Sequence, residues 1–200
     1  MKVPVNYFPA GGVCARRGVA CCLSSRRAKA PAMLERRITA VGPYRLMGKV
    51  VEGFKRGSRD LGWPTANLDP IAFEHKLDDE QEGVYLGWAA IEEDGVLLGG
   101  KLHKAILSIG WNPFFKNEQR TVESYLCHTF EKDFYGADMR LLICATIRPQ
   151  ADFASMDELI KAIKEDVDFG QVALDHSPFT EMQRDNLFAG MDTLTDKEGP

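Results

Sequence analysis

The stretch GVYLGWAAI, Gly83 to Ile91, has the length of a β-strand and is rich in residues that favour extended backbone. Four more runs of this kind are separated by glycine, proline, asparagine and charged residues: RLMGKVVEGF (45–54), HKAILSIGW (103–111), TVESYLCHTF (121–130) and MRLLICATI (139–147). Such a series predicts an antiparallel β-barrel or a β-sandwich. Asp94-Gly95 is the strongest local hairpin signal.

One helix is predicted after the strands. Ser155 as N-cap and Glu158 three positions later form a capping box. Apolar residues then recur at helical spacing and make one stripe: Met156, Leu159, Ile160, Ile163 and Val167. We expect this helix to close the barrel as a core element rather than to hold a cofactor. The sequence is also compatible with a second, loosely docked helix near the end of the chain.

The chain has 200 residues and a formal charge of −4. This length is enough for one domain with extra residues at its ends. Residues 1–34 hold six Lys or Arg, no acid and no apolar period. We predict a disordered basic extension over 1–36, a domain over 37–190 and a polar tail over 191–200. The acid-free start is typical of a mitochondrial transit peptide, and an upstream extension with the folded part starting near Met33 is the alternative.

The cysteines and the apolar runs bear on the compartment and the partners. Cys127 and Cys144 lie in apolar segments and no Cys-x-x-Cys pair occurs, which argues against a zinc site and for a reducing compartment. No apolar run is long enough to cross a bilayer. We expect a cytoplasmic protein, with mitochondria as the alternative.

The stretch GSRDLGWPTANLD, residues 57–69, carries the first candidate site. Pro64 fixes its own φ and pushes Trp63 into an extended conformation. Thr65 and Asn67 then point to the same side of a stiff ribbon. A hydroxyl and an amide oxygen suit Mg²⁺, which also binds substrate phosphates, although a Thr-x-Asn pair on a strand is often only a surface pair.

A glycine-rich, basic segment precedes this pair. Its glycines allow close approach of the backbone to phosphates and its cations match their charge: Gly53, Gly57 and Gly62, with Lys55, Arg56 and Arg59. The spacing fits neither a P-loop nor a Rossmann motif. If the segment binds a nucleotide, it does so in another way.

The stretch from Trp111 to Tyr135 holds seven aromatic residues and one notable carboxylate. The aromatic residues beside the turn at Pro113 are hard to bury, so they indicate a site for a flat ring. Glu123 lies on a predicted strand between apolar neighbours, where a general base would have a fixed position. The alternative is an edge-strand charge that faces water.

Together these segments resemble the riboflavin kinase (flavokinase) family of eukaryotes, of the monofunctional type, from about Tyr44 to Phe188. The resemblance rests on GKVVEGFKRGSRDLGWPTANL, GVYLGWA, HKAILSIGWNPFFKNEQRTVESYLCHTFEKDFYG, IRP at 147–149 and DNLF at 185–188. It implies a mostly β fold, a six-stranded antiparallel Greek-key barrel with a C-terminal helix. It also implies transfer of the γ-phosphoryl group of ATP to the ribityl 5′-hydroxyl of riboflavin, giving FMN and ADP.

The resemblance also implies roles for particular residues. Thr65 and Asn67 would hold Mg²⁺, with Zn²⁺ or Mn²⁺ as alternatives, and Glu123 would be the catalytic base. The ATP phosphates would lie under the loop, against Gly53, Arg56, Gly57, Arg59 and Thr65. Positions on the flavin side would be Asn112, Lys116, His128 and Arg148. A lysine is common in the family where this chain has Arg59, a forked donor that can grip phosphate differently.

Two other functions compete with this interpretation. A small barrel with a basic loop and nearby aromatic residues is typical of an OB-type oligonucleotide binder. A flavin carrier that has lost catalysis is the other, and the presence of Thr65, Asn67 and Glu123 together argues against it. For the kinase we expect riboflavin, ATP, FMN and ADP as partners, neither nucleic acid nor membrane, and a monomer.

Overall fold

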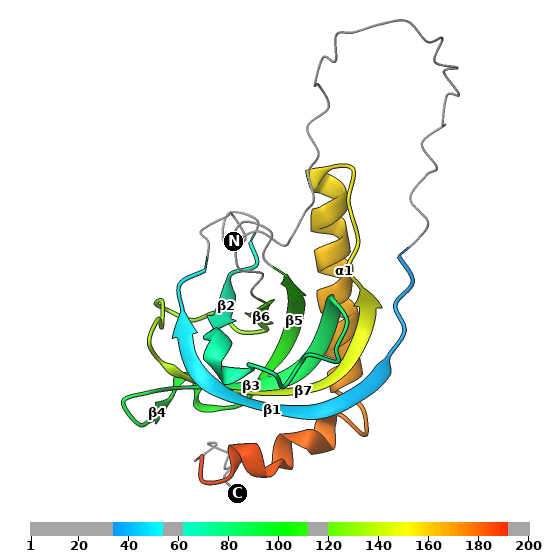
Figure 1. Cartoon of the computed structure of the whole chain (residues 1–200). Helices are drawn as coiled ribbons and strands as arrows, with labels where there is room; N and C mark the ends of the chain where they lie inside the picture. Colours follow the sequence, from blue (N-terminus) through cyan, green and yellow to red (C-terminus); the bar gives the residue numbers. More distant parts are fainter. Residues whose placement is uncertain (1–33, 54–61, 112–119, 192–200) are drawn as a thin grey trace, which may run out of the picture.

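The structure is a computed structural model that describes residues 34–53, 62–111 and 120–191 (Figure 1). Six strands pair in the order β3-β5-β6-β2-β1-β7, and β7 pairs again with β3, so the antiparallel sheet closes on itself. The strands are β1 (Thr39–Val51), β2 (Thr65–Leu68), β3 (Gly83–Glu93), β5 (His103–Trp111), β6 (Arg120–Leu126) and β7 (Asp138–Pro149). The predicted six-stranded antiparallel barrel is therefore confirmed.

A short hairpin extends β3 beyond the barrel. The two-residue strand β4 (Val96–Leu97) pairs with the end of β3 across Asp94 and Gly95, whose φ angles are 51° and 79°. Two consecutive left-handed residues are what a two-residue hairpin turn requires, and Asp-Gly adopts them at low cost. The hairpin predicted from Asp94-Gly95 is therefore present.

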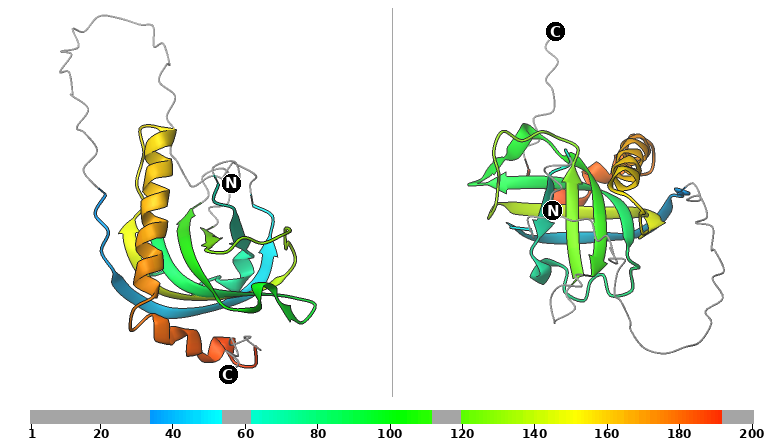
Figure 2. Two further views of the ribbon diagram at one scale, coloured as in Figure 1. Left: turned by 180° about the vertical axis from the view of Figure 1, so that it is seen from behind. Right: turned by 90° about the horizontal axis from the view of Figure 1, so that it is seen from above.

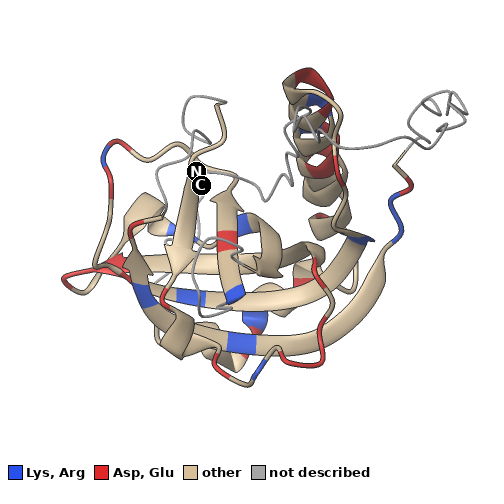
Figure 3. Ribbon diagram, turned by 45° about the horizontal axis from the view of Figure 1, so that its top comes forward, with Lys and Arg blue, Asp and Glu red and all other residues tan. Residues whose placement is uncertain are grey.

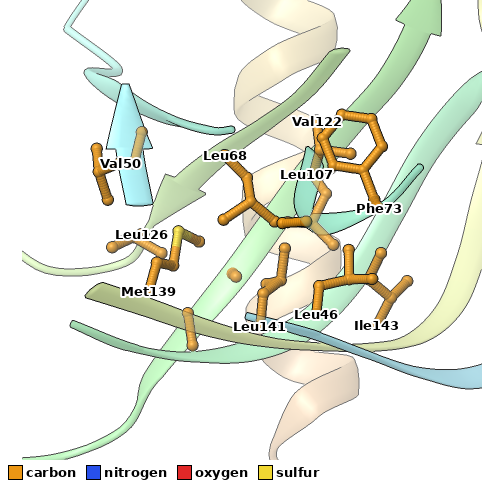
Figure 4. Close-up of a cluster of buried hydrophobic side chains, with 14 of the residues drawn as sticks. Leu46, Val50, Leu68, Phe73, Leu107, Val122, Leu126, Met139, Leu141 and Ile143 are labelled. Atoms are coloured by element: carbon orange, nitrogen blue, oxygen red, sulfur yellow. The ribbon is translucent and has the colours of Figure 1, made fainter. Parts of the chain in front are cut away.

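The barrel interior is filled by its own side chains. Alternate residues of the strands point inward and form one apolar core (Figure 4), which includes Leu46, Val50, Leu68, Leu107, Val122, Leu126, Met139, Leu141 and Ile143. Phe73, just after the short helix η1 (Pro70–Ala72), joins this core. A barrel of this size has room for side chains only. Functional groups on β2 and β6 must therefore lie on the outer face.

The helix α1 (Met156–Leu174) lies along the outside of the barrel rather than across its end (Figure 2). The reason is β3, which is buried on both faces: Tyr85 points into the barrel core, whereas Leu86 belongs to a second core under the helix. At Gly170 the helix comes so close that an added Cβ would lie 2.6 Å from Leu86 Cδ2. The expectation that the helix closes the barrel is corrected: it covers one wall.

The start of α1 follows the sequence prediction. Ser155 Oγ accepts from the Glu158 N–H at 3.2 Å, and Glu158 Oε2 accepts from the N–H of Ala154 at 3.1 Å, one residue before the position of an ideal capping box. The buried face differs from the predicted stripe. Met156 is exposed, whereas Asp166 is buried.

The chain after α1 forms two short 3-10 turns, η3 (Thr180–Arg184) and η4 (Asn186–Phe188), rather than a second α-helix. Leu187 and Phe188 pack into the core under α1. Arg45 of β1 donates two hydrogen bonds to the Asp185 carboxylate, at 2.8 and 2.7 Å, which lowers the pKa of Asp185. Within the described ranges no helix is long and apolar enough to span a membrane.

Candidate functional site

The pairing of β2 with β6 brings the main predicted residues together. Asn67 lies directly opposite Glu123, and Thr65 lies opposite Tyr125. On the other side of β6, Ser108 of β5 is also opposite Glu123. Directly opposed residues in a sheet have neighbouring side chains on one face. A polar row therefore crosses three strands on the outer face of the barrel.

Glu123 is sheltered although it lies outside the barrel. Its exposed fraction is 7% and that of Asn67 is 6%, and β6 is a central strand between β5 and β2. Between this wall and α1 is a cavity of about 70 Å³, lined among others by Thr65, Ser108, Glu123, Tyr125, Arg148 and Asp166. We call it the Glu123 cavity. The alternative of an edge-strand carboxylate that faces water is excluded by this geometry.

A larger cavity lies at the start of β2 and the end of β6. It measures about 460 Å³ and is lined by Gly62, Pro64 and the chain from His128 to Tyr135, together with Thr65 and Tyr125. Thr65 and Tyr125 also line the Glu123 cavity. The two cavities therefore share one wall at the Thr65–Tyr125 pair, two residues along the strands from the Asn67–Glu123 pair of the polar row.

Aromatic rings form one side of the larger cavity. His128 stacks on His103 with ring centroids 4.6 Å apart, and it meets Phe130 edge-on at 4.8 Å. Phe130 in turn contacts Phe134 at 4.6 Å. Burial lowers the pKa of His103 despite the contact of 2.9 Å between its Nε2 and the carbonyl oxygen of Leu98. An aromatic wall suits stacking with a flat ring.

His128 and Arg148 were expected on the same side of the site, and the structure does not bring them together. His128 lines the larger cavity, whereas Arg148 lines the Glu123 cavity. The strand β6 ends at Leu126, the His128 N–H turns back to the Leu126 carbonyl, and the chain from His128 to Tyr135 lines the larger cavity. The position of a residue after a strand depends on this turn, which the sequence motif alone does not reveal.

Arg148 is held by Asp166 of α1, a residue that the sequence did not suggest. Arg148 Nε lies 3.0 Å from both oxygens of Asp166, and Nη2 donates to Oδ2 at 2.6 Å. The side chains are 2% and 4% exposed. A carboxylate that binds the guanidinium through two nitrogens fixes its plane as well as its charge. The helix therefore supplies part of the site, in contrast to the purely structural role expected for it.

Comparison with known proteins now identifies the family. The family model described as Flavokinase (riboflavin kinase) matches residues 40–174. The chain is 38% identical over 146 residues to the riboflavin kinase of Homo sapiens. The aligned region covers 73% of this chain and 90% of that protein. The chain belongs to the riboflavin kinase family. Membership implies that ATP is a co-substrate and that a divalent metal ion takes part.

Two further relatives of the riboflavin kinase family agree. The crystal structure of riboflavin kinase from Trypanosoma brucei aligns with a TM-score of 0.56 at 31% identity, over 74% of this chain and 91% of that one. A bifunctional riboflavin kinase/FMN phosphatase of Arabidopsis thaliana is 41% identical over 145 residues, which is 72% of this chain but 37% of that protein. The match therefore covers a minor part of the plant enzyme.

Several residues expected from the riboflavin kinase resemblance lie outside the described part of the chain: Arg56, Gly57, Arg59, Asn112 and Lys116. Two flanking positions are described. Gly53 follows β1, and Gly62, with a φ of 87°, leads into β2. Both border the gap over residues 54–61, and Gly62 lines the larger cavity, so the chain re-enters the described part next to that cavity.

The described donor set fits the divalent metal of riboflavin kinases only when a substrate supplies further ligands. No group of three or more His, Cys, Asp or Glu that could hold a metal occurs among the described residues. Thr65 and Asn67 offer a hydroxyl and an amide oxygen on one face of β2. Two neutral oxygens are compatible with Mg²⁺, which keeps water and phosphate oxygens among its ligands.

Proposed function

We propose that phosphoryl transfer from ATP to the ribityl 5′-hydroxyl of riboflavin, giving FMN and ADP, takes place where the two cavities meet. One observation carries this proposal: Thr65 lines both cavities, and the Asn67–Glu123 pair of the polar row lies two residues further along the same two strands. Phosphoryl transfer needs mainly an aligned donor and acceptor and stabilisation of charge. A site with two compartments and one shared wall supplies the alignment.

Glu123 is proposed as the general base. Its carboxylate would accept the proton of the ribityl 5′-hydroxyl while the oxygen attacks the γ-phosphorus. Burial on a central strand holds the carboxylate in place and leaves only 7% of Glu123 exposed. No covalent intermediate with the protein is required.

Thr65 and Asn67 are proposed to hold Mg²⁺ together with the phosphates of ATP, with Zn²⁺ or Mn²⁺ as alternatives. The bound ion would neutralise charge on the phosphoryl oxygens. The stiff backbone at Pro64 would hold the two oxygens at a constant distance from Glu123 across the β2–β6 pair. In the predicted phosphate loop, Gly53, Arg56, Gly57 and Arg59 would contact the phosphates.

The larger cavity is proposed for ATP and the Glu123 cavity for the end of the ribityl chain. About 460 Å³ is within the range of ligand pockets, whereas about 70 Å³ holds only the reacting end of riboflavin, so the flavin ring would extend beyond it. His128 is accordingly assigned to the nucleotide in this proposal. Arg148 remains on the flavin side, and Asn112 and Lys116 are proposed to serve the flavin as well.

The direct test is incubation with riboflavin, ATP and Mg²⁺, followed by chromatographic separation of the flavins. We expect FMN and ADP to form in equal amounts. Absence of FMN with every metal and nucleotide tried, combined with tight riboflavin binding, would support the flavin carrier instead. Salt-sensitive binding of single-stranded oligonucleotides without flavin binding would support the OB-type function.

The remaining proposals concern the whole chain. We propose a monomer that binds neither nucleic acid nor membrane, located in the cytoplasm with mitochondria as the alternative. The domain is proposed over 37–190 with a tail over 191–200, and within the extension over 1–36 the residues before Met33 are proposed to be dispensable. A chain that starts at Met33 should melt and turn over as the full chain does. A large loss of either would show that the removed residues belong to the domain.

A further inference from the structure

The segment just before β1, residues 34–38, packs between β7 and α1. We call it the N-terminal strap. Its backbone is joined to β7 by the Arg37 N–H, which donates to the Ile147 carbonyl at 2.9 Å. The side chain of Arg36 is 11% exposed. The strap therefore has contacts of the kind found in a folded domain, although the sequence patterns place it at the end of a disordered extension.

Arg36 uses all three guanidinium nitrogens. Its Nε donates to Asp166 Oδ1 at 2.7 Å, and its Nη2 donates to the Ala162 carbonyl at 3.1 Å. Its Nη1 donates to the Leu34 carbonyl at 3.1 Å and lies 3.0 Å from Glu165 Oε2. Figure 3 shows further acidic residues along α1. The contacts fix both the strap and the side chain of Asp166.

Asp166 is thus shared by two arginines from distant parts of the chain. Arg36 approaches Oδ1 from the strap, while Arg148 contacts both oxygens from β7. The contact through two nitrogens fixes the plane of Arg148 relative to the carboxylate, but the pair as a unit can still move about the side-chain bonds of Asp166. A second forked donor on Oδ1 restricts that rotation and hence the plane in which Arg148 is held.

We propose that Arg36 is a positioning residue for flavin binding, which acts through Asp166 on the guanidinium of Arg148 in the Glu123 cavity. This inference rests on the proposed function to the extent that Arg148 serves the flavin side. Arg36 itself does not line the Glu123 cavity. Its loss should therefore weaken riboflavin binding and leave ATP binding and the reacting groups in place.

The test uses the full chain with Arg36→Gln, Arg36→Lys and, as a matched control from the same strap, Arg37→Gln. For Arg36→Gln we expect the KM for riboflavin to rise on the order of 10-fold, as for other residues that orient a ligand-binding group. The KM for ATP and kcat should stay within about twofold. Lysine keeps the charge without the fork and should recover part of the loss. Arg37→Gln should match the parent.

Two measurements test the positioning role of Arg36 independently of the proposed kinase reaction. The Nε–H NMR signal of Arg148, identified as the one lost in Arg148→Lys, should shift or broaden in Arg36→Gln and stay unchanged in Arg37→Gln, whether or not FMN is formed. The double variant with Arg148→Lys should lose no more riboflavin affinity than Arg148→Lys alone. An unchanged Arg148 signal, additive losses, or equal losses for riboflavin and ATP would overturn the proposal.

Discussion

Replacement of Glu123 by glutamine separates catalysis from structure more cleanly than any other change at the site. Glutamine has the same shape and still forms hydrogen bonds, but it cannot accept a proton at neutral pH. The side chain faces Asn67 and Ser108 across the two strand pairs. Both neighbours are polar and uncharged, so the amide that replaces the carboxylate remains among groups that can bond it.

The size of the effect follows from the role. A positioned general base contributes about 10²- to 10⁴-fold to the rate. At about 1.36 kcal/mol for each factor of ten, this corresponds to a rise of roughly 2.7 to 5.4 kcal/mol in the activation free energy. We expect kcat to fall by that factor, while riboflavin binding and the melting temperature stay nearly unchanged.

The assay is the initial rate of FMN formation at saturating ATP, with riboflavin fluorescence quenching and thermal melting on the same samples. Glu74→Gln is the matched control, because that carboxylate is 68% exposed and lies on neither cavity. A rate within a few-fold of the parent for Glu123→Gln would refute the role of the base. A large fall in melting temperature would instead show that the carboxylate supports the fold.

Three other changes test the nucleotide side, the electrostatics and the packing. Thr65→Ala should raise the KM for Mg·ATP and leave riboflavin quenching largely intact; equal loss of both would make Thr65 a structural residue. Arg45 lowers the pKa of Asp185, so the stabilisation is present above the unfolded value of about 3.9 and disappears as the pH falls through the lower folded pKa. The melting temperature of Asp185→Asn should therefore be lower than that of the parent at neutral pH, and the difference should disappear in acid. A difference that does not change with pH would contradict this. Gly87→Ala would place a Cβ 2.2 Å from the Leu142 carbonyl oxygen, so we expect about 1–3 kcal/mol lower stability in urea unfolding, and an unchanged midpoint would refute the clash.

Local features were predictable wherever a short pattern determines them. The capping box at Ser155 places the start of α1 correctly, and Asp94-Gly95 gives the hairpin turn. The alternation along β2 places Thr65 and Asn67 on one face, as expected from the extended backbone after Pro64. Each of these depends on residues within a few positions of one another.

Features that depend on distant partners were not predictable. Asp166 occurs in an amphipathic helix, where an isolated acid is normally exposed, and its burial is tolerated only because Arg148 and Arg36 neutralise it. The side of the barrel that His128 occupies depends on the turn after β6. Periodicity reports which face of an element is apolar, but it does not reveal which distant residue lies there.

The closure of the barrel by β7 has a consequence for synthesis of the chain. β7 pairs with both β1 and β3, and the buried carboxylate that completes the Glu123 cavity comes later still, from α1. On the ribosome, the end of β1 can pair with β2 early, but the long pairing of β1 with β7 must wait for most of the polypeptide, with apolar side chains uncovered meanwhile. Nascent chains should rely on chaperones during this interval, and truncated translation products should aggregate rather than bind substrate.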